Sequence, residues 1–393
     1  MSLAAPHPTP DRARPLIDAS PFRWHSPDVS LSAGELWTPP VPAGLSTGEQ
    51  GRALLHAARQ AGAADACVVG ALPFHPDEPA ALAVAPIPHR TAPRPQQPGA
   101  PWPPLLLRDG QSVPSAAEFE TLVERAVQAI RAGALEKVVL GRLLHLDLGG
   151  PPPCAAALVD RLAARHPAGF TFALRLPGRA DRTLVGASPE LLVRKRGATV
   201  TLRPMAGTRA RHPAPCTDGA LAADLLASTK DRAEHALMVE AIRSALAPLC
   251  RTLDVPDRPN VTSTATLWHL VTPITAELRD PGCSVLDVVE RLHPTPAVGG
   301  VPGVAARAFI REHEPFARDL FAGAVGWCDA RGDGEWAVTI RCAEIGAQAV
   351  RLFAGAGVVG DSVPALERAE TAAKFRTMLD ALGLDARTLG GAL

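Results

Sequence analysis

The chain has 393 residues, of which 47% are hydrophobic. Its 33 glycines and 40 prolines stay below the share of roughly 25–30% that is typical of low-complexity chains. This composition excludes a chain that is disordered over most of its length. Forty basic residues balance forty acidic residues, so the whole chain lacks the charge signature of a protein that binds nucleic acid or a membrane surface. A small, discrete substrate is the better expectation.

Two features bear on the cellular compartment. Residues 1–15 lack the apolar core of a signal peptide, and no segment approaches the roughly 18 consecutive apolar residues that a transmembrane helix requires. Seven cysteines are scattered without a Cys-x-x-Cys pair, which argues against a disulfide framework or a thiolate zinc site. We therefore expect a soluble, cytoplasmic protein whose cysteines are small buried side chains.

The first part of the chain carries no cluster of chemically informative residues. Eight prolines between residues 86 and 104 argue against a helix or a central strand and predict a loop or linker. We expect residues 1–110 to be an N-terminal flank within one large domain, and residues 111–393 to form its catalytic region.

Secondary-structure signals become clear after this linker. Ser115 and Glu118 form a capping box, and apolar residues then recur at helical spacing until Gly133, which predicts a helix. A second, long helix is predicted over about 230–250, with Leu237 among the apolar residues of one face. Between the two helices, apolar and β-branched runs predict strands at 136–144, 170–176, 183–187, 191–195 and 199–203.

The C-terminal part repeats this alternation. Short turns at 331–334 and 346–347 predict hairpins and therefore antiparallel pairing. The fold class is predicted to be α+β, with large sheets flanked by helices, and a doubly wound parallel sheet is disfavoured. The predicted elements are a helix at 284–292, a loop at 293–303, strands at 321–329, 336–344 and 349–359, and a final helix at 365–382.

Two helix-borne glutamates are candidate metal ligands. Glu234 is predicted to share the core-facing side of the long helix, although an exposed first turn, where an acid suits the helix dipole, is the alternative. Glu370 lies in the last helix, between Glu367 and Lys374, and its alternative is an ordinary surface ion pair. Two such carboxylates with few other ligands would suit Mg²⁺, which prefers oxygen ligands and keeps several waters.

Lys137 and Glu190 are candidates for acid–base chemistry. Lys137 interrupts an apolar strand, where burial can lower the pKa of a lysine enough for it to act as a general base. The alternative is a lysine that protects an edge strand from aggregation. Glu190 follows a tight turn and could project into a pocket as a general acid, or it could be a solvated turn residue.

Four further residues are candidates for binding a ligand. Arg341 is predicted to lie in a continuous strand, on a face of otherwise small residues that suits a carboxylate. Gly355 and Gly357 could let backbone amides approach an anion, which is weak evidence because no dinucleotide fingerprint accompanies them. His269 lies in an apolar stretch, where a buried and fully hydrogen-bonded histidine is the alternative.

Taken together and in this order, these stretches resemble the chorismate-utilising enzymes, and among them the isochorismate synthases of the siderophore type. The resemblance covers roughly residues 115–385. It rests on seven blocks, followed by Glu370-Thr371 and Lys374: EKVVL at 136–140, GASPEL at 186–191, KDRAEH at 230–235, LWHL at 267–270, HPTPA at 293–297, TIR at 339–341 and FAGAG at 353–357.

The resemblance implies a fold and a set of roles. The family has two face-packed, mainly antiparallel sheets with helices outside, as in anthranilate synthase component I, and its site lies in a cleft between them. By resemblance, Lys137 would activate a water and Glu190 would protonate the departing hydroxyl. The metal Mg²⁺ would be held by Glu234 and Glu370, with Glu367 assisting. Substrate would be bound by Gly207, Thr208, His269, Ala297, Arg341, Gly355, Gly357 and Lys374.

Three positions favour isochorismate synthase within this family. Lys137 is typical of the members that use water, whereas anthranilate synthases carry glutamine there. Ala206 replaces the lysine that aminodeoxychorismate synthases use as a nucleophile, and Ala297 stands where anthranilate and salicylate synthases usually have threonine. Against this, the Gly-Thr-Arg at 207–209 resembles the anthranilate and salicylate types, Gly141 replaces a usual serine and Thr229 a usual acidic residue.

The resemblance therefore predicts a Mg²⁺-dependent isochorismate synthase that acts on chorismate for a siderophore or a related 2,3-dihydroxybenzoate or salicylate product. The alternatives are a salicylate synthase, which would also eliminate pyruvate, and a catalytically silent chorismate-binding protein. We expect a monomer that binds no nucleic acid, no membrane and no glutaminase subunit, because the predicted reaction needs no ammonia.

Overall fold

The computed structural model of the chain describes residues 20–93, 105–179, 181–264, 267–385 and 389. Part of the predicted proline-rich linker, residues 94–104, lies outside these ranges. Its first part corrects the prediction of a loop, because residues 88–91 form an edge strand. An edge strand tolerates a proline at its first position, since the missing N–H is not needed there.

Two large sheets and one small sheet build the described part of the chain, and all their strand pairs are antiparallel. The ten-stranded sheet runs in the order β17 (Gly300–Val301), β7 (Lys137–Leu148), β21 (Ala349–Val358), β20 (Cys342–Ile345), β9 (Thr183–Ser188), β8 (Phe170–Arg175), β1 (Phe22–His25), β2 (Ser30–Ala33) and β5 (Pro88–Thr91), and β6 (Leu107–Val113) also pairs with β7.

The eight-stranded sheet runs in the order β13 (Cys250–Asp254), β16 (Ile274–Leu278), β11 (Thr199–Arg203), β10 (Leu191–Arg196), β19 (Gly334–Val338), β18 (Ala324–Asp329), β3 (Cys67–Leu72) and β4 (Ala81–Ala85). A three-stranded sheet, which the sequence did not predict, consists of β12 (Met205–Ala210), β15 (Leu267–Val271) and β14 (Asn260–Ser263). The predicted α+β class with antiparallel sheets is confirmed.

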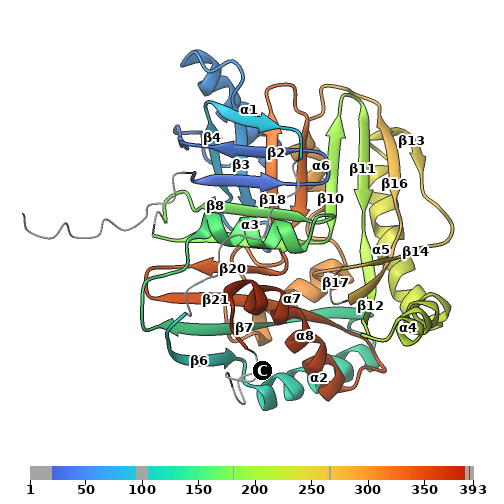
Figure 1. Cartoon of the computed structure of the whole chain (residues 1–393). Coiled ribbons are helices and arrows are strands. Elements are labelled where there is room, and N and C mark those ends of the chain that lie inside the picture. The colour runs from blue at the N-terminus through green and yellow to red at the C-terminus, as the bar shows by residue number, and fades with distance from the viewer. Residues whose placement is uncertain (1–19, 94–104, 180, 265–266, 386–388, 390–393) are drawn as a thin grey trace, which may run out of the picture.

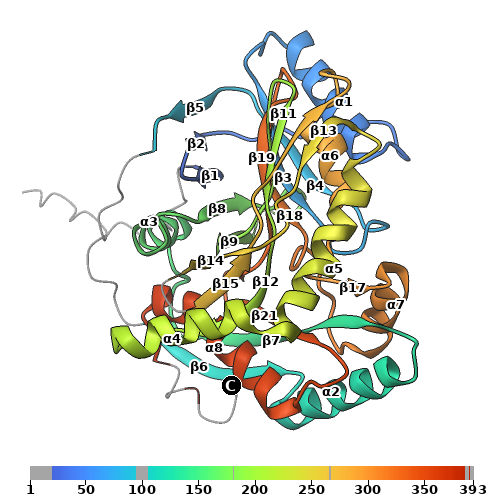
Figure 2. The same ribbon diagram turned by 90° about the vertical axis from the view of Figure 1, so that its right-hand side faces the viewer.

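The two large sheets pack face to face on a common core. Buried side chains of β1, β2 and β8 belong to the same apolar cluster as those of β3, β10 and β18. The indole Nε1 of Trp24 on β1 also donates a hydrogen bond of 3.0 Å to Glu335 on β19, in the other sheet. Figure 2 shows β11 and β19 running across the direction of β7 and β21.

Helices cover the outer faces of both sheets (Figure 1). Apolar residues of α3 (Ala155–Arg165) and α8 (Pro364–Leu382) pack on the outer face of the ten-stranded sheet in a second cluster. α1 (Thr47–Gln60), α5 (Thr229–Leu246) and α6 (Val285–Leu292) pack against the eight-stranded sheet. The remaining helices are α2 (Ala116–Arg131), which contacts α8 and β7, α4 (Pro215–Ala227), which contacts the three-stranded sheet, and α7 (Gly303–His313), which contacts β7 and β17.

The predicted long helix needs two corrections. It ends at Leu246 rather than near residue 250, because Cys250 already begins β13. Its buried face passes through His235, Met238 and Ile242, whereas Leu237 is 38% exposed. The predicted apolar face correctly included Met238, Ile242 and Leu246, but it extended to Leu237, which packing leaves exposed.

The predicted strand at 336–344 is also wrong as one element. It consists of β19 in the eight-stranded sheet and β20 in the ten-stranded sheet, joined by residues 339–341. Arg341 has a φ of 51°, outside the extended region, so the chain bends there and passes from one sheet to the other. The alternating face that was predicted around Arg341 does not exist.

The N-terminal flank contributes to both large sheets. It supplies β1, β2 and β5 to one and β3 and β4 to the other, none of which the sequence predicted. Of the seven cysteines, all are free, and four are buried as predicted, but Cys216 is exposed. Within the described residues, no helix is long and apolar enough to cross a membrane.

Candidate active site

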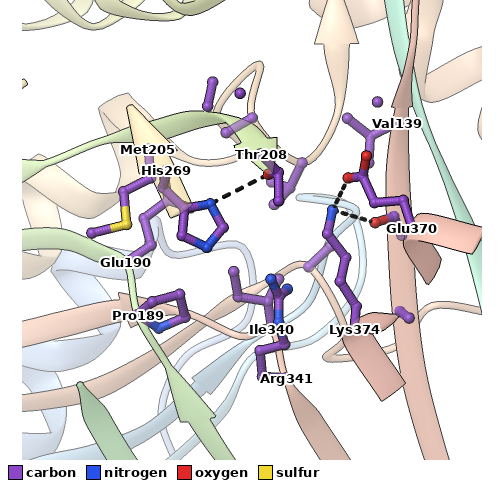
Figure 3. A pocket seen from close by; sticks show the side chains of 18 of the residues that line it. Val139, Pro189, Glu190, Met205, Thr208, His269, Ile340, Arg341, Glu370 and Lys374 are labelled. Atoms are coloured by element: carbon purple, nitrogen blue, oxygen red, sulfur yellow. Dashed lines mark hydrogen bonds and ion pairs between the residues drawn. The ribbon is translucent and has the colours of Figure 1, made fainter. Parts of the chain in front are cut away.

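One cavity brings together all but one of the predicted site residues (Figure 3). It lies where β7 and β21 of the ten-stranded sheet meet the three-stranded sheet and helices α5 and α8. The predicted residues that line it are Lys137, Glu190, Gly207, Thr208, Glu234, His269, Ala297, Arg341, Gly355, Gly357, Glu370 and Lys374. Glu367 is not among its lining residues.

Lys137 is the first residue of β7 and is almost fully buried. Its strand is paired on both sides, with β17 through Val301 and with β21 through Val358. The edge-strand alternative is therefore excluded. The Nζ of Lys137 lies 2.7 Å from Oε1 of Glu234, which reaches the cavity from α5.

Gly357 on β21 makes room for this ion pair. A Cβ atom at that position would lie 3.2 Å from Oε1 of Glu234 and 3.2 Å from Cε of Lys137. Both distances are shorter than ordinary van der Waals contacts, so a side chain there would push the pair apart. The contact gives Gly357 a steric role, and the anion-binding role that the sequence suggested stays a prediction.

Glu190 occupies the turn between β9 and β10 and is 4% exposed, so the alternative of a solvated turn residue is excluded. Burial raises the pKa of its carboxyl to about 7. A backbone hydrogen bond from Met205 and the positive charges of Lys137, Arg341 and Lys374 oppose this rise. A carboxylic acid with a pKa near neutrality can hold and release a proton under physiological conditions.

The pKa of Glu190 predicts a pH-dependent loss of stability. In the folded state the carboxyl has a pKa near 7, whereas in the unfolded chain it has its ordinary pKa of 4.5. Between these values the folded state retains a proton that the unfolded state has lost, so the free energy of unfolding falls as pH rises, by up to about 3 kcal/mol. Glu190→Gln should remove this part of the slope when urea unfolding is compared from pH 4.5 to 8. Parallel curves for both proteins would contradict the assignment.

Arg341 presents a guanidinium group to the cavity without a protein partner. Arg341 is 9% exposed and, within the described residues, its guanidinium group makes no hydrogen bond and no ion pair. Burial lowers the pKa of Arg341 to about 10, partly offset by the charges of Glu370 and Glu190, so it stays positive at neutral pH. Both Arg341 and Ala322, which also lines the cavity, have a positive φ. A buried cation held in a strained backbone and lacking an acceptor indicates a binding position for a carboxylate.

His269 on β15 offers an unused hydrogen-bonding atom. Its Nδ1 lies 3.3 Å from Oγ1 of Thr208 on β12, and its Nε2 is buried without a partner among the described residues. Burial lowers the pKa of His269 to about 3, helped by the charges of Arg341 and Lys374, so the imidazole is neutral. The histidine is buried, but it is not fully hydrogen-bonded, which indicates a ligand contact.

Glu370 and Lys374 form an ion pair one helical turn apart on α8, and Figure 3 shows the side chain of Arg341 beside that of Lys374. The Nζ of Lys374 also donates a hydrogen bond of 2.8 Å to the carbonyl oxygen of Gly355. This pair is not an ordinary surface pair, because both residues line the cavity.

The carboxylates of the cavity are suited to a hard divalent cation. Glu234 and Glu370 reach it from two different helices, and each is now neutralised by a lysine. Within the described residues, no cluster of three or more potential metal-ligating side chains occurs. A cation would thus rest on two carboxylates, completed by water and ligand oxygens, which is the coordination that Mg²⁺ accepts.

Glu367, the third predicted metal ligand, does not line the cavity. Its Oε1 accepts a hydrogen bond of 2.7 Å from Ser362. Burial raises the pKa of Glu367 to about 7, and the negative charge of Glu370 adds to the rise. Its role as a third metal ligand remains a prediction.

Sequence reasoning missed residues that shape the cavity walls. Arg318 donates hydrogen bonds to the carbonyl oxygens of Val139 (2.6 Å) and Val298 (2.9 Å). Both residues line the cavity, Val139 from β7 and Val298 from the segment before β17. The buried ion pair of Arg318 with Glu314, whose Oε1 also accepts the N–H of Gly141, holds Arg318 there. The four-residue spacing of Glu314 and Arg318 was the only available signal. The apolar lining residues Met205, Phe321, Ile340 and Phe353 were missed as well.

Comparison with known proteins agrees with this geometry. Residues 93–383 match the family model described as chorismate binding enzyme. The isochorismate synthase DhbC of Bacillus subtilis is 44% identical over 343 residues, which is 84% of each chain. The isochorismate synthase EntC of Escherichia coli K12 is 39% identical over 336 residues, covering 84% of this chain and 85% of EntC.

A solved structure supports the same assignment. The crystal structure of DhbC from Bacillus anthracis, described as a 2,3-dihydroxybenzoate-specific isochorismate synthase, superposes with a TM-score of 0.87 at 40% identity, covering 94% of this chain and 97% of that one. The resemblance that the sequence motifs indicated is confirmed. The chain belongs to the family of chorismate-binding enzymes.

Proposed function

We propose that this chain is an isochorismate synthase, which converts chorismate into isochorismate. The relatives described above carry this activity in their names. The observation that carries the proposal is the placement of a buried lysine, Lys137, and a buried carboxyl group with a raised pKa, Glu190, around one cavity that also holds the unpaired Arg341.

The reaction moves a hydroxyl group between two ring carbons. A water oxygen forms a bond to C2 while the bond from C4 to its hydroxyl breaks, and the ring double bonds shift. Lys137 takes the proton from the attacking water, and Glu190 gives a proton to the departing hydroxyl, which leaves as water. One water is consumed and one is released. The lysine then loses its proton to solvent and Glu190 regains one, which restores the starting state.

The two carboxylates of chorismate need separate cationic or hydrogen-bonding partners. Arg341 and Lys374 supply positive charge on one side of the cavity, and His269 Nε2 and Thr208 supply hydrogen bonds on the other. The backbone at Gly207, Ala297 and Gly355 completes the walls. Binding the ligand at both ends would hold C2 and C4 between the lysine and the glutamic acid.

Glu234 and Glu370 would hold Mg²⁺, with Glu367 assisting. When bound, Mg²⁺ supplies positive charge that binds a substrate carboxylate and stabilises negative charge. Glu234 also contacts Lys137, so the same side chain that serves the metal positions the proposed base.

Replacing one of these carboxylates tests the metal site. We expect Glu234→Gln to weaken Mg²⁺ activation and chorismate binding together by at least about tenfold, because metal and substrate carboxylate bind as one unit. Isothermal titration with Mg²⁺, with and without chorismate, measures both effects. Glu240→Gln, an exposed change on the same helix, is the matched control. An unaltered Mg²⁺ titration would remove Glu234 from the metal site.

The activity itself has a direct test. Purified protein is incubated with chorismate and Mg²⁺, the products are separated by chromatography, and a parallel reaction contains EDTA. Isochorismate that forms only without EDTA is the expected result. Salicylate with equimolar pyruvate would instead identify a salicylate synthase, the alternative that Thr208 keeps open, and unchanged chorismate would favour a silent binding protein.

The proposal also covers the pathway that uses the product and the partners of the protein. We assign the product to 2,3-dihydroxybenzoate or siderophore biosynthesis, because relatives of that type resemble the chain over most of its length. A monomer without a glutaminase subunit, acting in the cytoplasm, stays a prediction.

A further inference from the structure

A second cavity adjoins the catalytic cavity. The two share three lining residues, Pro189, Met205 and Arg341. Its other walls come from the end of α3 and the residues after it, from β14 and from α8. None of the roles assigned above uses this space.

Its lining is strongly basic. Four arginines line it, of which Arg211 is neutralised by an ion pair of 2.7 Å with Asp218. The side chains of the other three, Arg165, Arg203 and Arg341, make no hydrogen bond and no ion pair with any part of the chain that the structure describes. No aspartate or glutamate lines the cavity in the described ranges.

Three unpaired guanidinium groups around one cavity repel each other, and a bound anion would relieve this repulsion. They come from three separate elements, because Arg165 ends α3, Arg203 ends β11 and Arg341 joins β19 to β20. Hydroxyl groups of Thr262 and Ser263 on β14 add hydrogen-bond donors. Planar guanidinium groups and hydroxyl donors are the groups that bind carboxylates.

We propose that this second cavity, the capture cavity, binds the dicarboxylate substrate first and delivers it past Pro189 and Met205 to the catalytic cavity. Arg165 and Arg203 attract the anion, and Arg341, which lines both cavities, receives one carboxylate from them. A cleft lined by charge of one sign concentrates the field and raises the association rate of an oppositely charged ligand. This inference rests on the proposed function, since it takes chorismate as the ligand.

The association rate constant of chorismate tests the proposal. It is measured by stopped-flow tryptophan fluorescence in a Glu190→Gln background, in which bound chorismate is not consumed, in the presence of Mg²⁺. Arg203→Gln and Arg165→Gln should each lower this constant about three- to tenfold at low ionic strength. The difference from the parent should shrink towards zero near about 0.5 M NaCl, because salt screens the attraction. Arg165 is exposed, so its replacement does not threaten folding.

Arg125→Gln is the matched control, because it removes the same charge from an exposed position on α2 that lines neither cavity. Association constants that equal the control for both variants, at all salt concentrations, would overturn the capture cavity alone. Failure of the unsubstituted protein to bind chorismate in the presence of Mg²⁺ would overturn the proposed function, and the capture cavity with it.

Discussion

Replacing Glu190 with glutamine is expected to lower kcat for isochorismate formation by about 10²–10⁴-fold while changing the dissociation constant of chorismate less than about threefold. Glutamine keeps the size of the side chain and can still form hydrogen bonds, but it has no acidic proton to give. The buried carboxyl group, whose pKa is raised to about 7, is the proposed acid of the cavity. Steady-state rates and isothermal titration separate the two effects.

A second buried glutamate provides the control for this experiment. Glu344 on β20 is 2% exposed and forms ion pairs with Arg182 and Arg351, but it does not line the cavity. Glu344→Gln should lower stability and leave kcat within about twofold, since it removes no contact with substrate. If Glu190→Gln lost binding but retained the chemical rate, its role would be in binding and not in proton transfer.

Replacing Lys137 with glutamine is expected to lower kcat by a similar factor of about 10²–10⁴, because it removes the buried amine that we propose as the base of the cavity. Chorismate binding should weaken less than kcat falls, since Arg341 and Lys374, the proposed partners of the carboxylates, are unchanged. Single-turnover measurements at saturating chorismate and Mg²⁺ report the chemical step directly.

Lys195 provides the control for Lys137, because it is also a buried lysine that lies in a strand and forms an ion pair. It is 1% exposed, lies in a strand and forms an ion pair of 3.0 Å with Asp333, but it lies away from the catalytic cavity. Lys195→Gln should therefore reduce the free energy of unfolding without affecting kcat. Turnover by Lys137→Gln within tenfold of the parent would exclude Lys137 as the base and would favour a binding role.

Local sequence patterns were sufficient for many of the elements. The capping box at Ser115 and Glu118 is present in the structure and begins α2. The hairpin turns after β18 and β20 join antiparallel pairs as predicted. Such features depend on residues that are close together in the chain, so spacing and turn chemistry alone predict them.

Long-range packing decided the elements that were missed or wrong. Residues 339–341 look like part of a strand, and only the neighbours of β19 and β20 in two different sheets require the bend at Arg341. The strands of the N-terminal flank likewise pair with distant segments, as β3 does with β18 and β1 with β8. Strands that are so far apart in the sequence carry no local periodicity that shows which of them will pair.

For the site, the sequence by itself determined which residue types were available and, through motif order, the family to which they belong. The tertiary structure decided what those residues do. It placed Lys137 against Glu234, left the Arg341 guanidinium group and His269 Nε2 without partners in the described residues, and turned Glu367 towards Ser362. Burial, charge and unsatisfied hydrogen bonds are properties of side chains brought together by folding, and they arise only once β7, α5 and the chain between the two sheets are packed around one cavity.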